Sequence, residues 1–89
     1  MKNKNWKLED DLFTIEYVMK YYKSKDWNDL IEFISKEIGT SKSSVKMRIL
    51  NYVSILGEKG LDNYADISKE AIELSLKKYN KSQMLLAFQ

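Results

Sequence analysis

The chain has 89 residues, of which 44% are hydrophobic, and its formal net charge is only +2. This length and composition predict one globular domain over residues 1–89, with no room for a separate catalytic domain and no apolar run long enough to cross a bilayer. Histidine and cysteine do not occur, which removes disulfides, the commonest metal ligand and the usual general base. We therefore expect a cytoplasmic protein that is not an enzyme and that binds no metal or cofactor.

Helical periodicity predicts a first helix over residues 8–23. The apolar positions follow steps of four and three residues along one face: Leu8, Leu12, Ile15, Met19 and Tyr22. Three acids, Glu9, Asp10 and Asp11, fill the first turn, where the positive end of the helix dipole favours them. Because adjacent acids point in different directions, dipole pairing and solubility explain them better than a metal site does.

Two further helices are predicted on either side of Gly39. Asp26 is a suitable N-cap for a helix over 27–38, and Gly39 stands where a left-handed C-terminal residue is wanted. Thr40 or Ser41 can cap the next helix, over 41–56. Its inward stripe consists of Val45, Ile49, Tyr52 and Leu56.

The last third of the chain predicts a fourth helix over 68–79, capped by Ser68, and a short fifth helix over 82–88. The fold class is therefore all-α, a small bundle of four to five helices with a helix-turn-helix core. Residues 80–89 form an apolar tail, either packed on the domain or exposed as an oligomerisation surface. In the second case the contact residues would be Met84, Leu85 and Phe88.

Two aromatic pairs allow alternative interpretations. Trp6 and Trp27 stand at the starts of the first two helices, where they favour packing in a small core over base stacking or a partner contact. Tyr17 and Tyr21 would form a partner surface if they lie off the core-facing stripe.

The segment from Thr40 to Leu56 is the strongest functional signal. Its formal charge is +3, from Lys42, Lys46 and Arg48 with no acid. Two helices joined by a few residues around Gly39 have the spacing of a helix-turn-helix, whose second helix lies in the major groove. The candidate DNA-binding residues are Ser41, Lys42, Ser44, Lys46, Met47, Arg48 and Asn51.

The chemistry of this set suits DNA. Arg48 would bond a guanine edge and Asn51 an adenine edge, while Lys42 and Lys46 would neutralise phosphates. Serine hydroxyls and free amides at the helix start would accept a phosphate. The plainer alternative is that each is an ordinary solvated residue on a cap or an outer face.

Short motifs add a family resemblance that covers roughly residues 6–79. The run Trp6-Lys7-Leu8-Glu9-Asp10-Asp11-Leu12 resembles the start of a Myb/SANT-like first helix. Ser44-Val45, Met47 and Asn51-Tyr52, followed by Gly60-Leu61, resemble the small helical domain that precedes HNH nuclease domains in some restriction endonucleases. The resemblance implies DNA binding with nuclease chemistry supplied elsewhere, because the His-Asn-His nuclease is missing.

Two functions follow as hypotheses. The first is a small helix-turn-helix protein that binds double-stranded DNA through helix 41–56, as a regulator or mobile-element accessory factor, with a homodimer or protein partner adding affinity. The second is a protein-interaction module or a small inhibitor of a larger nucleic-acid enzyme. The acidic first turn and the low total charge favour the second.

Overall fold

The structure, a computed structural model, describes residues 5–57 and 66–89, and within them it contains α-helices and no strand. The helices are α1 (Leu8–Tyr21), α2 (Trp27–Ile38), α3 (Lys42–Leu56), α4 (Asp66–Ser75) and α5 (Lys81–Phe88). The all-α prediction is confirmed. None of the helices in the described ranges combines the length and apolarity that a membrane span requires.

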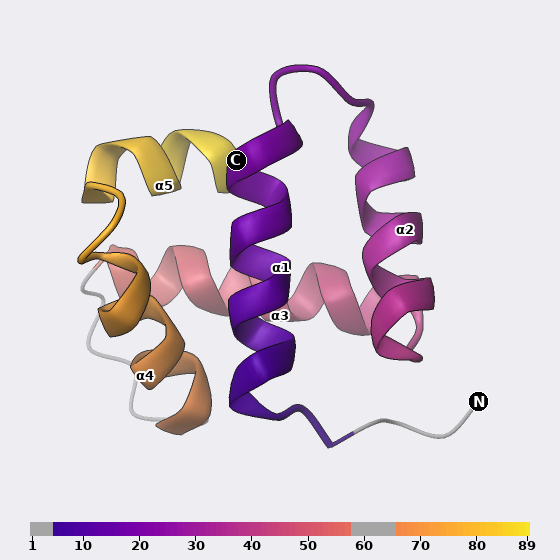
Figure 1. The fold of residues 1–89 in the computed structure, drawn as a ribbon, viewed down its shortest axis with the longest axis horizontal. Coiled ribbons are helices and arrows are strands. Elements are labelled where there is room, and N and C mark those ends of the chain that lie inside the picture. The colour runs from indigo at the N-terminus through magenta and orange to yellow at the C-terminus, as the bar shows by residue number, and fades with distance from the viewer. Residues whose placement is uncertain (1–4, 58–65) are drawn as a thin grey trace.

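The helices form two layers (Figure 1). Helices α1 and α2 lie side by side in front, and α3 crosses behind them. Helices α4 and α5 lie on the other side of α1, and both also contact α3. Because α3 touches α2, α4 and α5, it carries one face of the core along its whole length.

Local capping explains why α2 and α3 begin and end close to where the sequence predicts. The Asp26 carboxylate accepts a hydrogen bond from the Asn28 amide at 3.0 Å and so caps α2. Gly39 ends α2 with φ +84°, a left-handed conformation in which glycine avoids the strain of a side chain. Helix α1 ends at Tyr21, with Tyr22 as its C-cap, two residues before the predicted boundary.

The prediction for α4 was wrong at both ends. The helix already includes Asp66, so Ser68 lies inside it and is fully buried instead of capping it. It stops at Ser75, whose carbonyl accepts from the amides of Lys78 and Tyr79 in the following turn. Asn80 then caps α5, accepting from the Gln83 amide at 2.8 Å while the Gln83 side chain accepts from the Asn80 amide at 3.0 Å.

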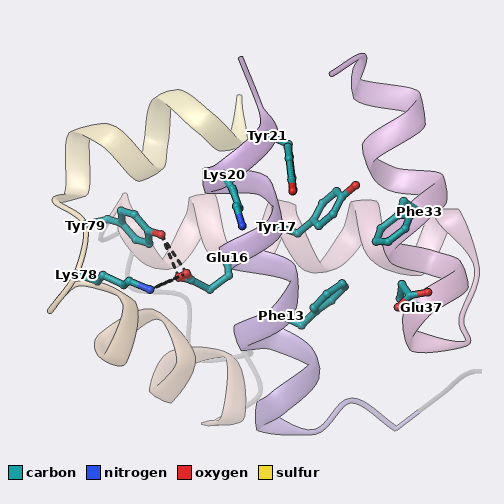
Figure 2. A pocket seen from close by; sticks show the side chains of 9 residues that line it. All are labelled: Phe13, Glu16, Tyr17, Lys20, Tyr21, Phe33, Glu37, Lys78 and Tyr79. Carbon is teal, nitrogen blue, oxygen red and sulfur yellow. Dashed lines mark hydrogen bonds and ion pairs between the residues drawn. The ribbon is translucent and has the colours of Figure 1, made fainter. Parts of the chain in front are cut away.

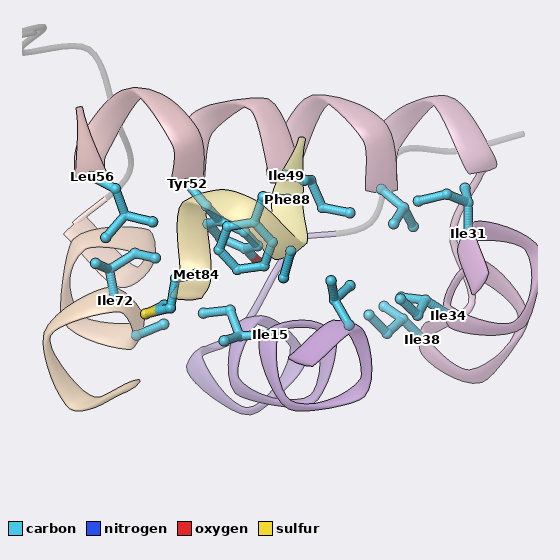
Figure 3. Packing of buried hydrophobic residues seen from close by; sticks show 14 residues of the cluster. Ile15, Ile31, Ile34, Ile38, Ile49, Tyr52, Leu56, Ile72, Met84 and Phe88 are labelled. Atoms are coloured by element: carbon cyan, nitrogen blue, oxygen red, sulfur yellow. The ribbon is translucent and has the colours of Figure 1, made fainter. Parts of the chain in front are cut away.

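The core lies between α3 and the other four helices (Figure 3). The predicted inward stripe of α3 is buried throughout. On α1 the buried line differs from the predicted one, because it runs through Asp11, Thr14, Ile15 and Val18. Leu8, Leu12, Met19 and Tyr22 are partly buried at its flanks. Helix α1 contacts α2, α4 and α5 and therefore buries more than one narrow stripe of residues. For this reason the spacing of apolar residues alone does not locate the most buried line of the helix.

The apolar tail belongs to this core. Met84 is fully buried and Phe88 is 4% exposed. The centroids of the Phe88 and Tyr52 rings lie 5.5 Å apart. Leu85 is partly buried against the same cluster. Of the two alternatives for residues 80–89, the structure therefore shows a fifth helix packed on the domain. Met84 and Phe88 are not available for the predicted oligomer contact, since the protein's own core already covers them.

Candidate nucleic-acid interface

Three residues, Gly39, Thr40 and Ser41, connect α2 to α3. The amides of Gly39 and Thr40 both donate to the Ser35 carbonyl at 2.9 Å, which closes the end of α2. The Ser41 hydroxyl accepts from the Ser44 amide at 3.1 Å and caps α3. Hydrogen bonds therefore fix the turn both at the end of α2 and at the start of α3, and they set the direction of α3 relative to α2.

A buried polar cluster joins α1 to the middle of α3. The Asp11 side chain is fully buried. Arg48 donates two hydrogen bonds to it, from Nε to Oδ1 and from Nη2 to Oδ2, each 2.8 Å long. The Tyr52 hydroxyl also donates to Asp11 Oδ1. A carboxylate bound at both oxygens by a planar guanidinium is among the stronger ion pairs in proteins.

Trp6 extends this cluster to the start of α3. Its indole Nε1 donates to the Ser44 hydroxyl at 3.2 Å, and the Arg48 guanidinium lies over its ring, 4.9 Å from the centroid. Arg48 is thus held between an aromatic face and a carboxylate, with only 14% of its side chain exposed. Trp6 fastens the chain before α1 to α3, in line with the packing role predicted for it, whereas Trp27 is 36% exposed.

The charges within the cluster reinforce one another. Burial opposes the charged form of Arg48, but the hydrogen bonds and negative charge of Asp11 outweigh it and raise the pKa of the guanidinium. Burial, and then the charge of Asp11, raise the pKa of Tyr52 well above its ordinary value. The Arg48 guanidinium therefore stays charged and the Tyr52 phenol stays protonated at neutral pH.

This arrangement divides the predicted DNA-binding set into internal and exposed members. Arg48 is bound to Asp11, Ser44 accepts from Trp6, and Ser41 caps the helix. The polar groups of these three residues are therefore engaged in hydrogen bonds within the protein. The remaining members lie as follows: Asn51 is partly buried, Lys42 and Lys46 are exposed, and Met47 is 60% exposed. Arg48 is therefore not free to bond a guanine edge as predicted.

Sequence reasoning missed two residues here. The sequence pattern assigns Asp11 to the helix dipole, although it lies four residues before Ile15 and therefore on the same helical face. An acid on the core-facing side of a helix indicates a buried ion pair, and Arg48, the one arginine of the chain, is a suitable partner. Leu50 was also left out, yet it is 59% exposed beside Lys46 and Met47.

A shallow hollow of about 330 Å³ borders this surface. Its lining comes from the start of α2, the middle of α3 and the end of the chain: Trp27, Lys46, Ile49, Leu50, Phe88 and Gln89. The exposed face of α3 thus passes from lysines at its N-terminal half to an apolar margin. In the described ranges, no group of three or more carboxylates is placed to hold a metal ion.

No protein family, curated protein or solved structure matches this chain. The geometry of its own residues is therefore the basis for assigning a function.

Proposed function

We propose that this protein binds double-stranded DNA through the exposed face of α3, defined by Lys42, Ser43, Lys46, Met47 and Leu50. One observation carries the proposal: the first two turns of α3 follow a three-residue turn and expose two lysines without an acid between them. A helix in this position, crossing behind two packed helices, is the geometry that helix-turn-helix proteins place in the major groove.

The electrostatics of the helix start support the same conclusion. Lys42 and Lys46 are four residues apart, so they project from one side of α3. The positive end of the helix dipole adds to their attraction for phosphate. Asp11, the acid that contacts the middle of α3, is paired with Arg48.

The apolar members fit a base edge better than a phosphate. Met47 and Leu50 are each about 60% exposed and lie on the turn that follows Lys46. Apolar side chains in the major groove contact the thymine methyl group. Because it makes few charged contacts, the protein would have a modest affinity for a single DNA site. The two lysines would determine how this affinity depends on salt concentration.

Fluorescence polarisation with a labelled random duplex, at low and at physiological salt, tests the proposal. The Lys42→Ala/Lys46→Ala variant should bind more weakly and reduce the slope of log affinity against log salt by about 2. The matched control is Lys23→Ala/Lys77→Ala, which removes the same charge from exposed positions outside α3. Equal losses in both variants, or no binding by the unaltered protein at low salt, would refute it.

A protein-interaction module is the second candidate, and one observation favours it. An aromatic groove lies between α1 and α2, on the side of the molecule away from α3 (Figure 2). Binding to a protein through this groove would be less sensitive to salt than DNA binding and would survive the exchange of Lys42 and Lys46.

A further inference from the structure

The groove has a volume of about 680 Å³ and is lined by five aromatic rings, four of them between α1 and α2 and the fifth, that of Tyr79, on the α4 side. Phe13, Tyr17 and Tyr21 follow one another at four-residue spacing along α1, and Phe33 faces them from α2 (Figure 2). The Tyr17 and Phe33 rings stack at 4.6 Å with an interplanar angle of 13°. The centroid of the Tyr17 ring also lies 5.8 Å from that of Phe13 and 4.6 Å from that of Tyr21. The rings therefore form one continuous apolar floor.

This floor lies at the edge of the core, against which Phe13 and Tyr17 pack. Phe33 is 42% exposed, and the three α1 rings are only partly buried. The Tyr17 and Tyr21 rings thus lie off the centre of the buried line of α1, which was the condition for a partner surface. Aromatic rings that hold one another in place offer a large contact area with little loss of side-chain entropy on binding.

The two ends of the groove carry opposite charges. At the C-terminal end of α1, Lys20 and Lys25 lie 5.7 and 5.2 Å from the centroid of the Tyr21 ring. At the other end, exposed Glu37 lines the groove itself, and together with exposed Glu9 it lines a small adjoining hollow that also includes Phe13.

The wall of the groove on the α4 side is already internally paired. Glu16 accepts from Lys78 Nζ at 2.7 Å and from the Tyr79 hydroxyl at 3.0 Å. The hydrogen bond from Lys78 is the largest cause of the lowered pKa of Glu16. The charges at the two ends therefore determine the direction in which an occupant lies.

We infer that this groove binds an amphipathic α-helix of a partner protein, about three turns long, running antiparallel to α1. The stretch of α1 from Glu9 to Tyr21 spans about 18 Å, slightly more than the length of three helical turns. A groove between two helices with an apolar floor is the usual receptor for such a helix. Ordinary helices carry acids in the first turn and bases in the last, so an antiparallel helix would place its acids at Lys20 and Lys25 and its bases at Glu9 and Glu37.

The charge pattern disfavours nucleic acid as the occupant. Glu16 is paired with Lys78, and Glu9 and Glu37 would repel a phosphate backbone at their end of the groove. Since the groove and α3 lie on opposite sides of α1, this inference does not depend on DNA binding.

Two designed peptides of about 14 residues test the inference on the full chain by isothermal titration calorimetry. Both carry leucines at helical spacing, one with glutamates first and lysines last, the other with these charges exchanged. The first should bind about tenfold more tightly, because its end charges meet opposite charges in the groove. The Glu9→Lys/Lys20→Glu/Lys25→Glu/Glu37→Lys variant should prefer the second peptide.

A matched pair of variants tests the aromatic floor. Phe33→Ser should abolish most of the binding, whereas Leu86→Ser, at a position 66% exposed and outside the groove, should leave it unchanged. Circular dichroism on every variant verifies that it is folded. Equal affinity for the two peptides, or binding to neither at millimolar concentration, would overturn the inference.

Discussion

At the residue scale, Asp11, Arg48 and Tyr52 depend on one another. Asp11 is fully buried, and both of its oxygens are bonded by the two α3 side chains. Removal of one partner from a buried ion pair leaves an uncompensated charge and costs about 3–5 kcal/mol. Replacement of the whole group by apolar side chains removes the charge together with its partner and costs less.

Arg48→Met should therefore lower the free energy of unfolding by about 3 kcal/mol. The triple variant Asp11→Leu/Arg48→Met/Tyr52→Phe should lower it by less than Arg48→Met alone. Urea denaturation followed by circular dichroism measures both. If the triple variant is the less stable of the two, the cluster does not act as a charge-compensated unit.

At the element scale, α5 shows how neighbours decide the role of an apolar helix. Met84, Leu85, Leu86 and Phe88 cover most of its circumference, so the sequence alone does not tell a core face from an oligomer contact. The structure buries Met84 and Phe88 against the rest of the domain and leaves Leu86 66% exposed. The helix thus contributes to the stability of the domain.

Phe88→Ala should lower the free energy of unfolding by about 3–5 kcal/mol, because it opens a cavity beside Tyr52. Leu86→Ala, the control, should change it by less than about 0.5 kcal/mol. Denaturant titrations give these values, and sedimentation of both variants gives their mass. A Phe88→Ala protein of unchanged stability but lower mass would instead identify Phe88 as an oligomer contact.

The elements also show how far local sequence determines structure. The boundaries of α2 and α3 were predictable because Asp26, Gly39 and Ser41 are specific stop and start residues. The boundaries of α4 were not, because Ser68 has the chemistry of a cap yet lies inside the helix. The role of Arg48 was missed because periodicity assigns a backbone position to a face, whereas a long side chain can bend back toward a neighbouring helix.

At the scale of the whole molecule, the fold presents two different surfaces on opposite sides of α1. The exposed face of α3 carries lysines and apolar side chains, and the groove between α1 and α2 carries aromatic rings between opposite charges. The core, including the Asp11 cluster, lies between them and holds both in position. Conditions that weaken this cluster should therefore affect the stability of the entire domain.

Stability should fall at alkaline pH because of Tyr52. Burial and the charge of Asp11 raise its pKa in the folded protein, so the unfolded chain loses this proton first. The stabilisation is complete below about pH 10 and is lost as the pH rises toward the folded pKa. Thermal melting between neutral pH and pH 11 should show a smaller loss for Tyr52→Phe than for a control Tyr22→Phe; equal losses would exclude Tyr52 as the cause.

A titration with duplex DNA, followed by ¹H–¹⁵N correlation spectra of the labelled protein at low salt, tests DNA binding through α3 most directly. Our account predicts shifts at Lys42, Ser43, Lys46, Met47 and Leu50 that reverse when salt is added, with little change at Tyr17 and Phe33. Shifts concentrated in the groove between α1 and α2, or no shifts at all, would contradict it.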